Sequence, residues 1–299
     1  MNKLFAVILL VTTFFSCSKH IGYHYSEHTA PSRNKNVCGN LKDNVILYCI
    51  FVDVHAYHPF SAYDIESTMD SVHKATKWLE CQAEYNNIPL NITPVLHKKG
   101  SRVSFHERKT LVRPYLHLFK KPLTKKKYAQ YTNQWADYIC HYAGRSVKQK
   151  NTAKVGTKVK AHDLESLIHI LRNNYETDGL AVMFFVNGYY ERDMCMAFNI
   201  YNNGPTPEYA VITHKSPGAI THEFLHLFGG IDLYPHAQHP GFNYKDIKEE
   251  YPNEIMRISH KNLDKLMLSP ITKYYIGWKD DLPKSDLRML YHYAEVLEY

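Results

Sequence analysis

The sequence predicts an α/β fold in which a twisted, mixed sheet is covered by helices. Short apolar runs typical of strands alternate with longer segments whose apolar residues recur every three or four positions, as in amphipathic helices. No internal repeat or Gly/Ser-rich linker divides residues 44–299, which indicates one domain. The chain is 44% hydrophobic and 13% aromatic, which supplies enough apolar area for a core and excludes intrinsic disorder.

The first 43 residues have the pattern of an export signal followed by a tether. Residues 1–16 carry one lysine and then an apolar run too short to cross a bilayer, which is typical of a signal peptide. Cys17 ends a sequence that resembles a bacterial lipobox, although Phe14 stands where leucine is usual. Residues 17–43 are polar and aperiodic. We therefore expect a lipid-anchored tether that holds an exported protein to a membrane, facing the periplasm or on the cell surface.

Five cysteines follow the lipobox. Because five is odd, at least one thiol stays outside any intramolecular disulfide, and the pairing cannot be derived from sequence. Cys38 and Cys49 are the nearest pair. No two of the five have CxxC spacing, which argues against a cysteine-based zinc or redox motif.

Strands and helices alternate from residue 44 onward. Strands are expected where apolar residues run together or alternate, and helices where they recur at helical steps. The expected strands are residues 45–54, 90–96, 180–186, 194–201 and 209–214, and the expected helices are residues 64–86, 128–144 and 164–175. Glycine commonly ends helices, so the second helix should end at Gly144 and the third near Gly179.

Residues after 269 predict two further helices. Ser269 and Pro270 are suited to a helix N-cap and first turn, and Gly277 would end that helix. A helical stripe of apolar residues then runs over residues 287–297. Both segments are interpreted as packing elements rather than parts of a functional site.

One helix carries a pattern suited to metal chemistry. Pro217 fits its first turn, and His222 and His226 lie four residues apart, so both imidazoles project from one face and can share one metal ion. Glu223 is rotated by about 100° and can reach a water on that metal without binding the metal itself. This geometry predicts two metal ligands and a general base.

A third ligand has to come from beyond the helix. Gly229 and Gly230 allow the chain to turn back, and Asp232 then brings a carboxylate six residues after His226. Two neutral imidazoles and one carboxylate match the donor set of a catalytic zinc site with an open position for water. The sequence therefore predicts one Zn²⁺ ion held by His222, His226 and Asp232.

The segment HEFLHLFGGID resembles the metzincin clan of zinc metallopeptidases in its HExxHxxGxxD form, as in the snapalysin type. The resemblance covers about residues 180–278. It implies a zincin-like fold with an upper part, residues 44–229, that contains the active-site helix, and a smaller C-terminal part, residues 230–299, that contains a methionine turn at Met256. It also implies that the strand at residues 194–201 pairs with an extended peptide substrate.

Several residues remain alternatives. His236 or His239 could replace Asp232 as third ligand, or a glutamate on a second helix could do so. The glutamates placed for that role are Glu249, Glu250 and Glu254. Some metzincins carry a tyrosine two residues after the methionine, where this chain has Ile258, so Tyr234 is the candidate for stabilising the transition state.

These residues predict a zinc-dependent endopeptidase in which Glu223 is the general base and the substrate is a protein or peptide. The alternative is a non-catalytic surface lipoprotein that keeps the zinc and binds protein or glycan.

The formal charge of +7 arises from residues 98–127, which hold eleven Lys and Arg against Glu107. An anionic ligand is one interpretation of this segment and a solvated loop the other, whereas nucleic acid is not expected for an exported peptidase.

Overall fold

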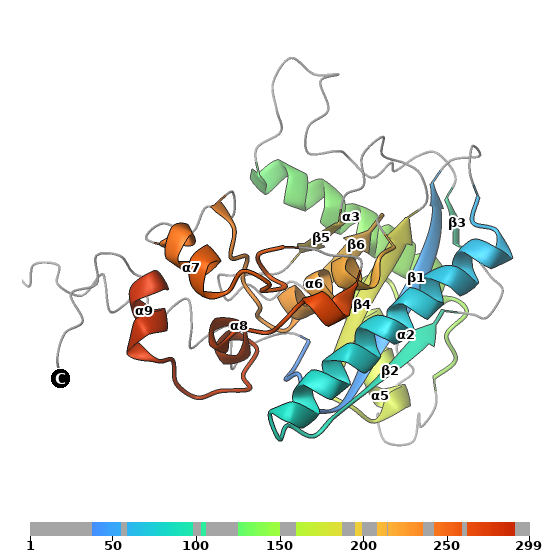
Figure 1. The fold of residues 1–299 in the computed structure, drawn as a ribbon. Coiled ribbons are helices and arrows are strands. Elements are labelled where there is room, and N and C mark those ends of the chain that lie inside the picture. Colours follow the sequence, from blue (N-terminus) through green and yellow to red (C-terminus); the bar gives the residue numbers. More distant parts are fainter. Residues whose placement is uncertain are drawn as a thin grey trace, which may run out of the picture.

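The computed structural model describes residues 38–54, 59–97, 103–105, 125–149, 160–186, 195–198, 208–213, 215–235, 242–258 and 262–290 (Figure 1). The predicted signal peptide, Cys17, and nearly all of the tether lie outside these residues. So does most of the basic segment. Within the described ranges, no helix is long and apolar enough to cross a membrane.

A mixed sheet of six strands forms the centre of the described structure. The strands are β1 (Asp43–Val54), β2 (Leu90–Leu96), β3 (Val103–Phe105), β4 (Gly179–Val186), β5 (Cys195–Phe198) and β6 (Tyr209–Ile212). Their order is β2-β1-β4-β6-β5, and β3 also pairs with β1. All neighbouring strands are parallel except β5, which runs antiparallel to β6. The predicted α/β fold with a mixed sheet is confirmed.

Helices cover both faces of this sheet (Figure 1). Helices α2 (Ala62–Tyr85) and α6 (Pro217–Leu227) pack on one face, and α3 (Lys125–Gly144) and α5 (Leu164–Tyr175) on the other. Successive residues of β1 and β4 therefore enter two different cores, and all eight residues of β4 are buried. This two-sided burial explains why both strands are continuous apolar runs in the sequence.

Helix α6 is enclosed rather than amphipathic. It begins at Pro217, five residues after β6 ends at Ile212, and the hydroxyl of its N-cap, Ser216, accepts a hydrogen bond from the backbone N–H of Ala219. Every residue from Gly218 to Leu227 is buried. The polar residues at the end of this helix therefore lie inside the protein, which gives them a well-defined geometry.

The C-terminal elements pack against the core that contains α2 and α6. They are helix α7 (Tyr244–Glu250), the short helix η2 (Leu263–Lys265), α8 (Pro270–Tyr275) and α9 (Lys284–Leu290). Figure 1 shows α7, α8 and α9 gathered at one side of the sheet. Ser269 is the N-cap of α8, as predicted, and the indole N–H of Trp278 donates to the carbonyl of Leu41 at 2.7 Å.

One sequence-based expectation needs correction. Helix α5 ends at Tyr175, and its left-handed cap is Glu176, with φ of 53°, rather than a glycine near residue 179. Gly179 instead begins β4, where a Cβ atom would lie 3.0 Å from the Val45 side chain. None of the five described cysteines forms a disulfide, so Cys38 and Cys49, the pair nearest in sequence, are not joined although both are buried.

Candidate metal centre

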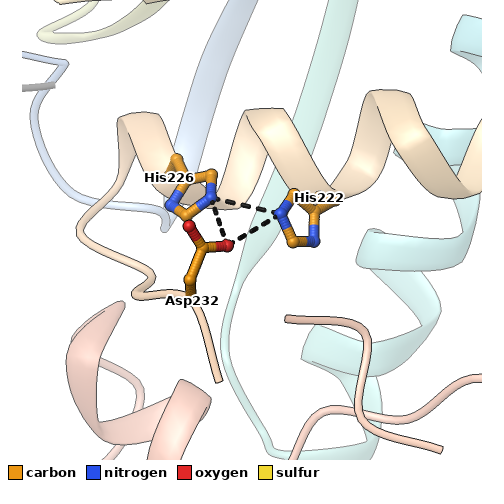
Figure 2. Close-up of side chains that lie close together, drawn as sticks. All are labelled: His222, His226 and Asp232. Atoms are coloured by element: carbon orange, nitrogen blue, oxygen red, sulfur yellow. Dashed lines mark hydrogen bonds and ion pairs between the residues drawn. The ribbon is translucent and has the colours of Figure 1, made fainter. Parts of the chain in front are cut away.

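The two histidines of α6 face the same side of the helix, as their four-residue spacing predicts (Figure 2). Their ring centroids lie 4.8 Å apart, and the two Nε2 atoms are separated by 3.2 Å. Both side chains are buried, with 9% of His222 and 5% of His226 exposed. Figure 2 shows both rings directed toward Asp232.

A tight turn after α6 brings Asp232 to these rings. Gly229 adopts φ of 96°, a left-handed conformation that favours glycine. The N–H of Gly230 then donates to the carbonyl of Leu225 at 2.8 Å, and a Cβ atom at residue 230 would lie only 2.9 Å from that oxygen. Oδ1 of Asp232 lies 3.1 Å from Nε2 of each histidine. The two glycines thus provide the turn that the sequence predicted.

The three converging atoms are suited to a cation. His222 directs Nδ1 at the carbonyl oxygen of Ile255, 2.9 Å away, and His226 directs Nδ1 at that of Gly230, 2.8 Å away. Since a carbonyl only accepts hydrogen bonds, each Nδ1 carries a proton, and each Nε2 of a neutral ring then presents a lone pair. Two lone pairs and a carboxylate oxygen therefore meet at one point, where a positive charge is needed.

The spacing of these atoms fits a first-row metal. Ligands about 2.0–2.1 Å from a tetrahedral zinc ion lie about 3.3 Å from one another. The three observed separations are 3.1, 3.1 and 3.2 Å. Among the described residues, His222, His226 and Asp232 form the group whose ligand atoms lie close enough together, within 4.8 Å, to hold a metal ion.

The pKa values of His226 and Asp232 depend strongly on each other's charge. Burial disfavours a charged imidazole, but the neighbouring Asp232 carboxylate outweighs that effect and raises the pKa of His226 to about 9. Burial also opposes ionisation of Asp232, yet His226 and His222 hold the pKa of its carboxyl well below the ordinary value. Without a metal, a proton on His226 thus supplies the positive charge.

Glu223 lies on the same helix as the histidines but outside the group of metal-ligand atoms. It is 6% exposed, and burial raises the pKa of its carboxyl, while His222 and His226 act in the opposite direction. The carboxylate accepts a hydrogen bond from the backbone N–H of Ala197 in β5. Helix α6 therefore holds an ionisable carboxyl group beside the imidazoles, as the sequence predicted.

Strand β5 occupies the end of the strand order in the described sheet. It lies within the strand expected at residues 194–201, whose remaining residues are outside the described ranges, and its register with β6 runs from Cys195 opposite Ile212 to Phe198 opposite Tyr209. Since β5 pairs with one described neighbour, it lies at an edge of the described sheet. It also contacts α6, the helix that carries His222 and His226. Pairing of this edge with a substrate stays a prediction.

The predicted methionine turn lies directly beside the centre. Met256 is buried, and its carbonyl accepts a hydrogen bond from Leu233, the residue after Asp232, at 2.8 Å. The preceding residue, Ile255, supplies the carbonyl that orients His222. The sequence predicts a methionine turn at Met256 but not that the Ile255 carbonyl orients His222. Every residue has a carbonyl, and no side-chain pattern marks this one.

The alternative ligands are placed differently. Glu254 is completely buried, and its oxygens accept hydrogen bonds from within the protein. Glu249 and Glu250 are exposed on α7. None of these three glutamates belongs to the group of ligand atoms around Asp232. Tyr234 and Ile258 are partly buried, and the role of Tyr234 in stabilising the transition state stays a prediction.

His236 and His239 lie outside the described residues, so their candidacy as third ligand stays open. Asp232, in contrast, is seen within reach of both imidazoles. Comparisons with known proteins supply no further residue assignments: no model of a known protein family matches the chain, and no curated protein sequence matches it.

Proposed function

We propose that this chain is a zinc-dependent endopeptidase exported as a bacterial lipoprotein. The observation that carries the proposal is the convergence of two imidazole Nε2 atoms and one carboxylate oxygen, beside a buried glutamate on the same helix. Two imidazoles and one carboxylate form a donor set found in catalytic zinc sites, and three protein ligands are typical of catalytic rather than structural zinc sites. The resemblance to metzincins in the HExxHxxGxxD segment points the same way.

Each side chain has a defined task in this proposal. Bound zinc would supply a Lewis acid that polarises a peptide carbonyl and acidifies a water molecule. Glu223 takes a proton from the attacking water and returns it to the leaving amine as the C–N bond breaks. Burial makes its carboxylate a better proton acceptor than an exposed one, since burial raises the pKa of the carboxyl. His222 and His226 stay oriented because their Nδ1–H groups donate to backbone carbonyls.

An extended protein or peptide segment is the proposed substrate. Among the described strands, β5 lies at an edge of the sheet and contacts α6, and backbone groups at a sheet edge can pair with a second strand without particular side chains. Such pairing would bring an extended peptide close to Glu223, whose carboxylate accepts the N–H of Ala197 in β5.

The lipoprotein part of the proposal rests on residues 1–17. Metabolic labelling with a radioactive fatty acid should label the wild-type chain and leave Cys17→Ser unlabelled. Both forms should be exported if residues 1–16 act as a signal peptide. Labelling that persists in Cys17→Ser would contradict lipidation at this residue.

Proteolysis by the soluble Cys17→Ser form tests the enzymatic proposal. We expect it to cleave unfolded casein, to lose activity when a chelator removes the metal, and to regain activity with zinc. Glu223→Gln keeps the shape and the ligands but cannot accept a proton, so it should bind zinc normally while activity falls at least about 100-fold. One zinc ion per chain without chelator-sensitive cleavage would favour the non-catalytic lipoprotein that binds protein or glycan.

A further inference from the structure

The carboxylate of Glu254 is buried in the turn that precedes Met256, with 0% of the residue exposed. Its Oε1 atom accepts hydrogen bonds from the backbone N–H of Met256 at 3.1 Å and from the hydroxyl of Thr272 at 2.8 Å. Its Oε2 atom accepts one from the backbone N–H of Ser269. The side chain therefore joins the turn at residues 254–256 to the first turn of α8.

This turn contacts the segments that carry two of the three proposed metal ligands. The carbonyl of Ile255 accepts the Nδ1–H of His222, and the carbonyl of Met256 accepts the N–H of Leu233, next to Asp232. Both carbonyls come from the two residues that follow Glu254. A shift of the turn would consequently move His222 and the Asp232 segment together.

A buried carboxylate, rather than an apolar side chain, holds the turn at residues 254–256 in place. Burying a carboxylate is costly unless its oxygens are hydrogen-bonded, and a core of apolar residues would avoid that cost. Here both oxygens are satisfied, and each accepts at least one hydrogen bond from a backbone N–H. Backbone donors have fixed positions, so the carboxylate sets the distance between the turn and α8 more rigidly than apolar packing would.

We propose that Glu254 is a positioning residue of the metal centre, which acts through the carbonyls of Ile255 and Met256 and binds no metal itself. This inference rests on the proposed metal site and extends it. Groups that orient metal ligands typically contribute about 10- to 100-fold to metal affinity. Loss of the Glu254 carboxylate should therefore weaken zinc binding even though every ligand remains present.

Zinc affinity of the metal-free soluble chain, measured by competition with a chromophoric chelator, tests this role. In Glu254→Gln an amide NH₂ replaces one oxygen and faces a donor instead of accepting from it, so affinity should fall about tenfold. Thr272→Val removes a single hydrogen bond from the carboxylate with little change in shape, and affinity should fall about threefold. The Co²⁺-loaded variants should also show altered d–d absorption bands, which report ligand geometry.

Asp286→Asn is the matched control. Asp286 is likewise a buried carboxylate, with 1% exposed, and accepts a hydrogen bond from the hydroxyl of Tyr251 at 2.7 Å. Unlike Glu254, it has no hydrogen bond to Met256 within the part of the chain that the structure describes. We expect Asp286→Asn to lower the unfolding temperature while changing zinc affinity by less than about twofold. This variant separates a general loss of stability from an effect on the centre.

The outcomes are distinct. Unchanged affinity and unchanged Co²⁺ bands in Glu254→Gln, with wild-type protein binding zinc, would overturn the positioning role and leave the peptidase proposal intact. Wild-type protein that binds no zinc would instead overturn the metal site itself. If Glu254→Gln fails to fold, Thr272→Val decides the question, because wild-type affinity in that variant would contradict the role.

Discussion

Nδ1 of His222 and the carbonyl oxygen of Ile255 lie 2.9 Å apart, although 33 residues separate them in sequence. This contact fixes which ring nitrogen of His222 faces Asp232. Gly230 does the same for His226 through its own carbonyl. The orientation of both imidazoles thus depends on backbone carbonyls in the turns that surround α6.

Asp232 is expected to be the third metal ligand. Asp232→Ala removes the carboxylate oxygen that lies 3.1 Å from both Nε2 atoms and leaves two ligands, so zinc content after dialysis should fall from about one ion per chain to near zero. Metal analysis by mass spectrometry measures this content. Normal zinc content in Asp232→Ala would mean that another residue is the third ligand, and His236 would be the next to test.

Zinc binding should release about one proton at neutral pH. The pKa of His226 is raised to about 9 in the metal-free protein, so this ring carries a proton at pH 7 that the metal must displace. Apparent zinc affinity should therefore rise about tenfold per pH unit as the pH approaches 9 and level off above it. Calorimetric titrations in buffers of different ionisation enthalpy count the protons, and no release at pH 7 would contradict the assignment.

The same pair of charges should affect the stability of the metal-free protein. Because the pKa of His226 is raised above its ordinary value of 6.5, its contribution is present below pH 6.5 and is lost as the pH rises through about 9. The pKa of Asp232 is lowered, so its contribution is present above 3.8 and lost as the pH falls further. The stability difference between wild type and Asp232→Asn should thus shrink from pH 6.5 to pH 9.5. Urea unfolding at several pH values measures it.

Gly230→Ala should disturb both the turn and the metal. A Cβ atom there would lie 2.9 Å from the carbonyl oxygen of Leu225, so the chain before Asp232 must shift. We expect a loss of about 1–3 kcal/mol of unfolding free energy together with weaker zinc binding. Gly277→Ala is the control: its φ of 81° makes alanine strained, but the added atom meets nothing within 4 Å and lies at the end of α8. This control should lose about 1 kcal/mol of unfolding free energy and keep its zinc affinity. Equal zinc affinity in the two variants would contradict a role of the turn at Gly230 in zinc binding.

Removal of the metal should lower the unfolding temperature. A metal bound at 1,000 times its dissociation constant stabilises the folded state by about 4 kcal/mol. In a chain of this size that corresponds to roughly 8–16 °C. Differential scanning fluorimetry with and without chelator measures the shift, and Asp232→Ala, which lacks a ligand, should show almost none.

The group formed by His222, His226 and Asp232 could be predicted from sequence because its geometry is local. His222 and His226 lie one helical turn apart, and the turn that returns Asp232 needs only six residues. The strand at residues 45–54 was equally predictable, since burial on both faces produces an apolar run. In both cases neighbours in sequence determine the geometry.

Contacts between distant segments could not be predicted in this way. Glu254 was a candidate ligand from its charge and place, but its carboxylate is engaged by donors around residues 256, 269 and 272, which only the folded chain brings together. The antiparallel direction of β5 also follows from tertiary structure, because its apolar residues would suit either direction. Glu176 in a left-handed conformation has no marker in the sequence either.

Anomalous diffraction from crystals of the zinc-loaded soluble chain, recorded on both sides of the zinc absorption edge, tests the central claim most directly. The account predicts one strong peak within about 2.0–2.2 Å of Nε2 of His222, Nε2 of His226 and a carboxylate oxygen of Asp232. Glu223 should stay outside the ligand set. A zinc peak elsewhere in the molecule, or one that binds His222 and His226 but not Asp232, would contradict it.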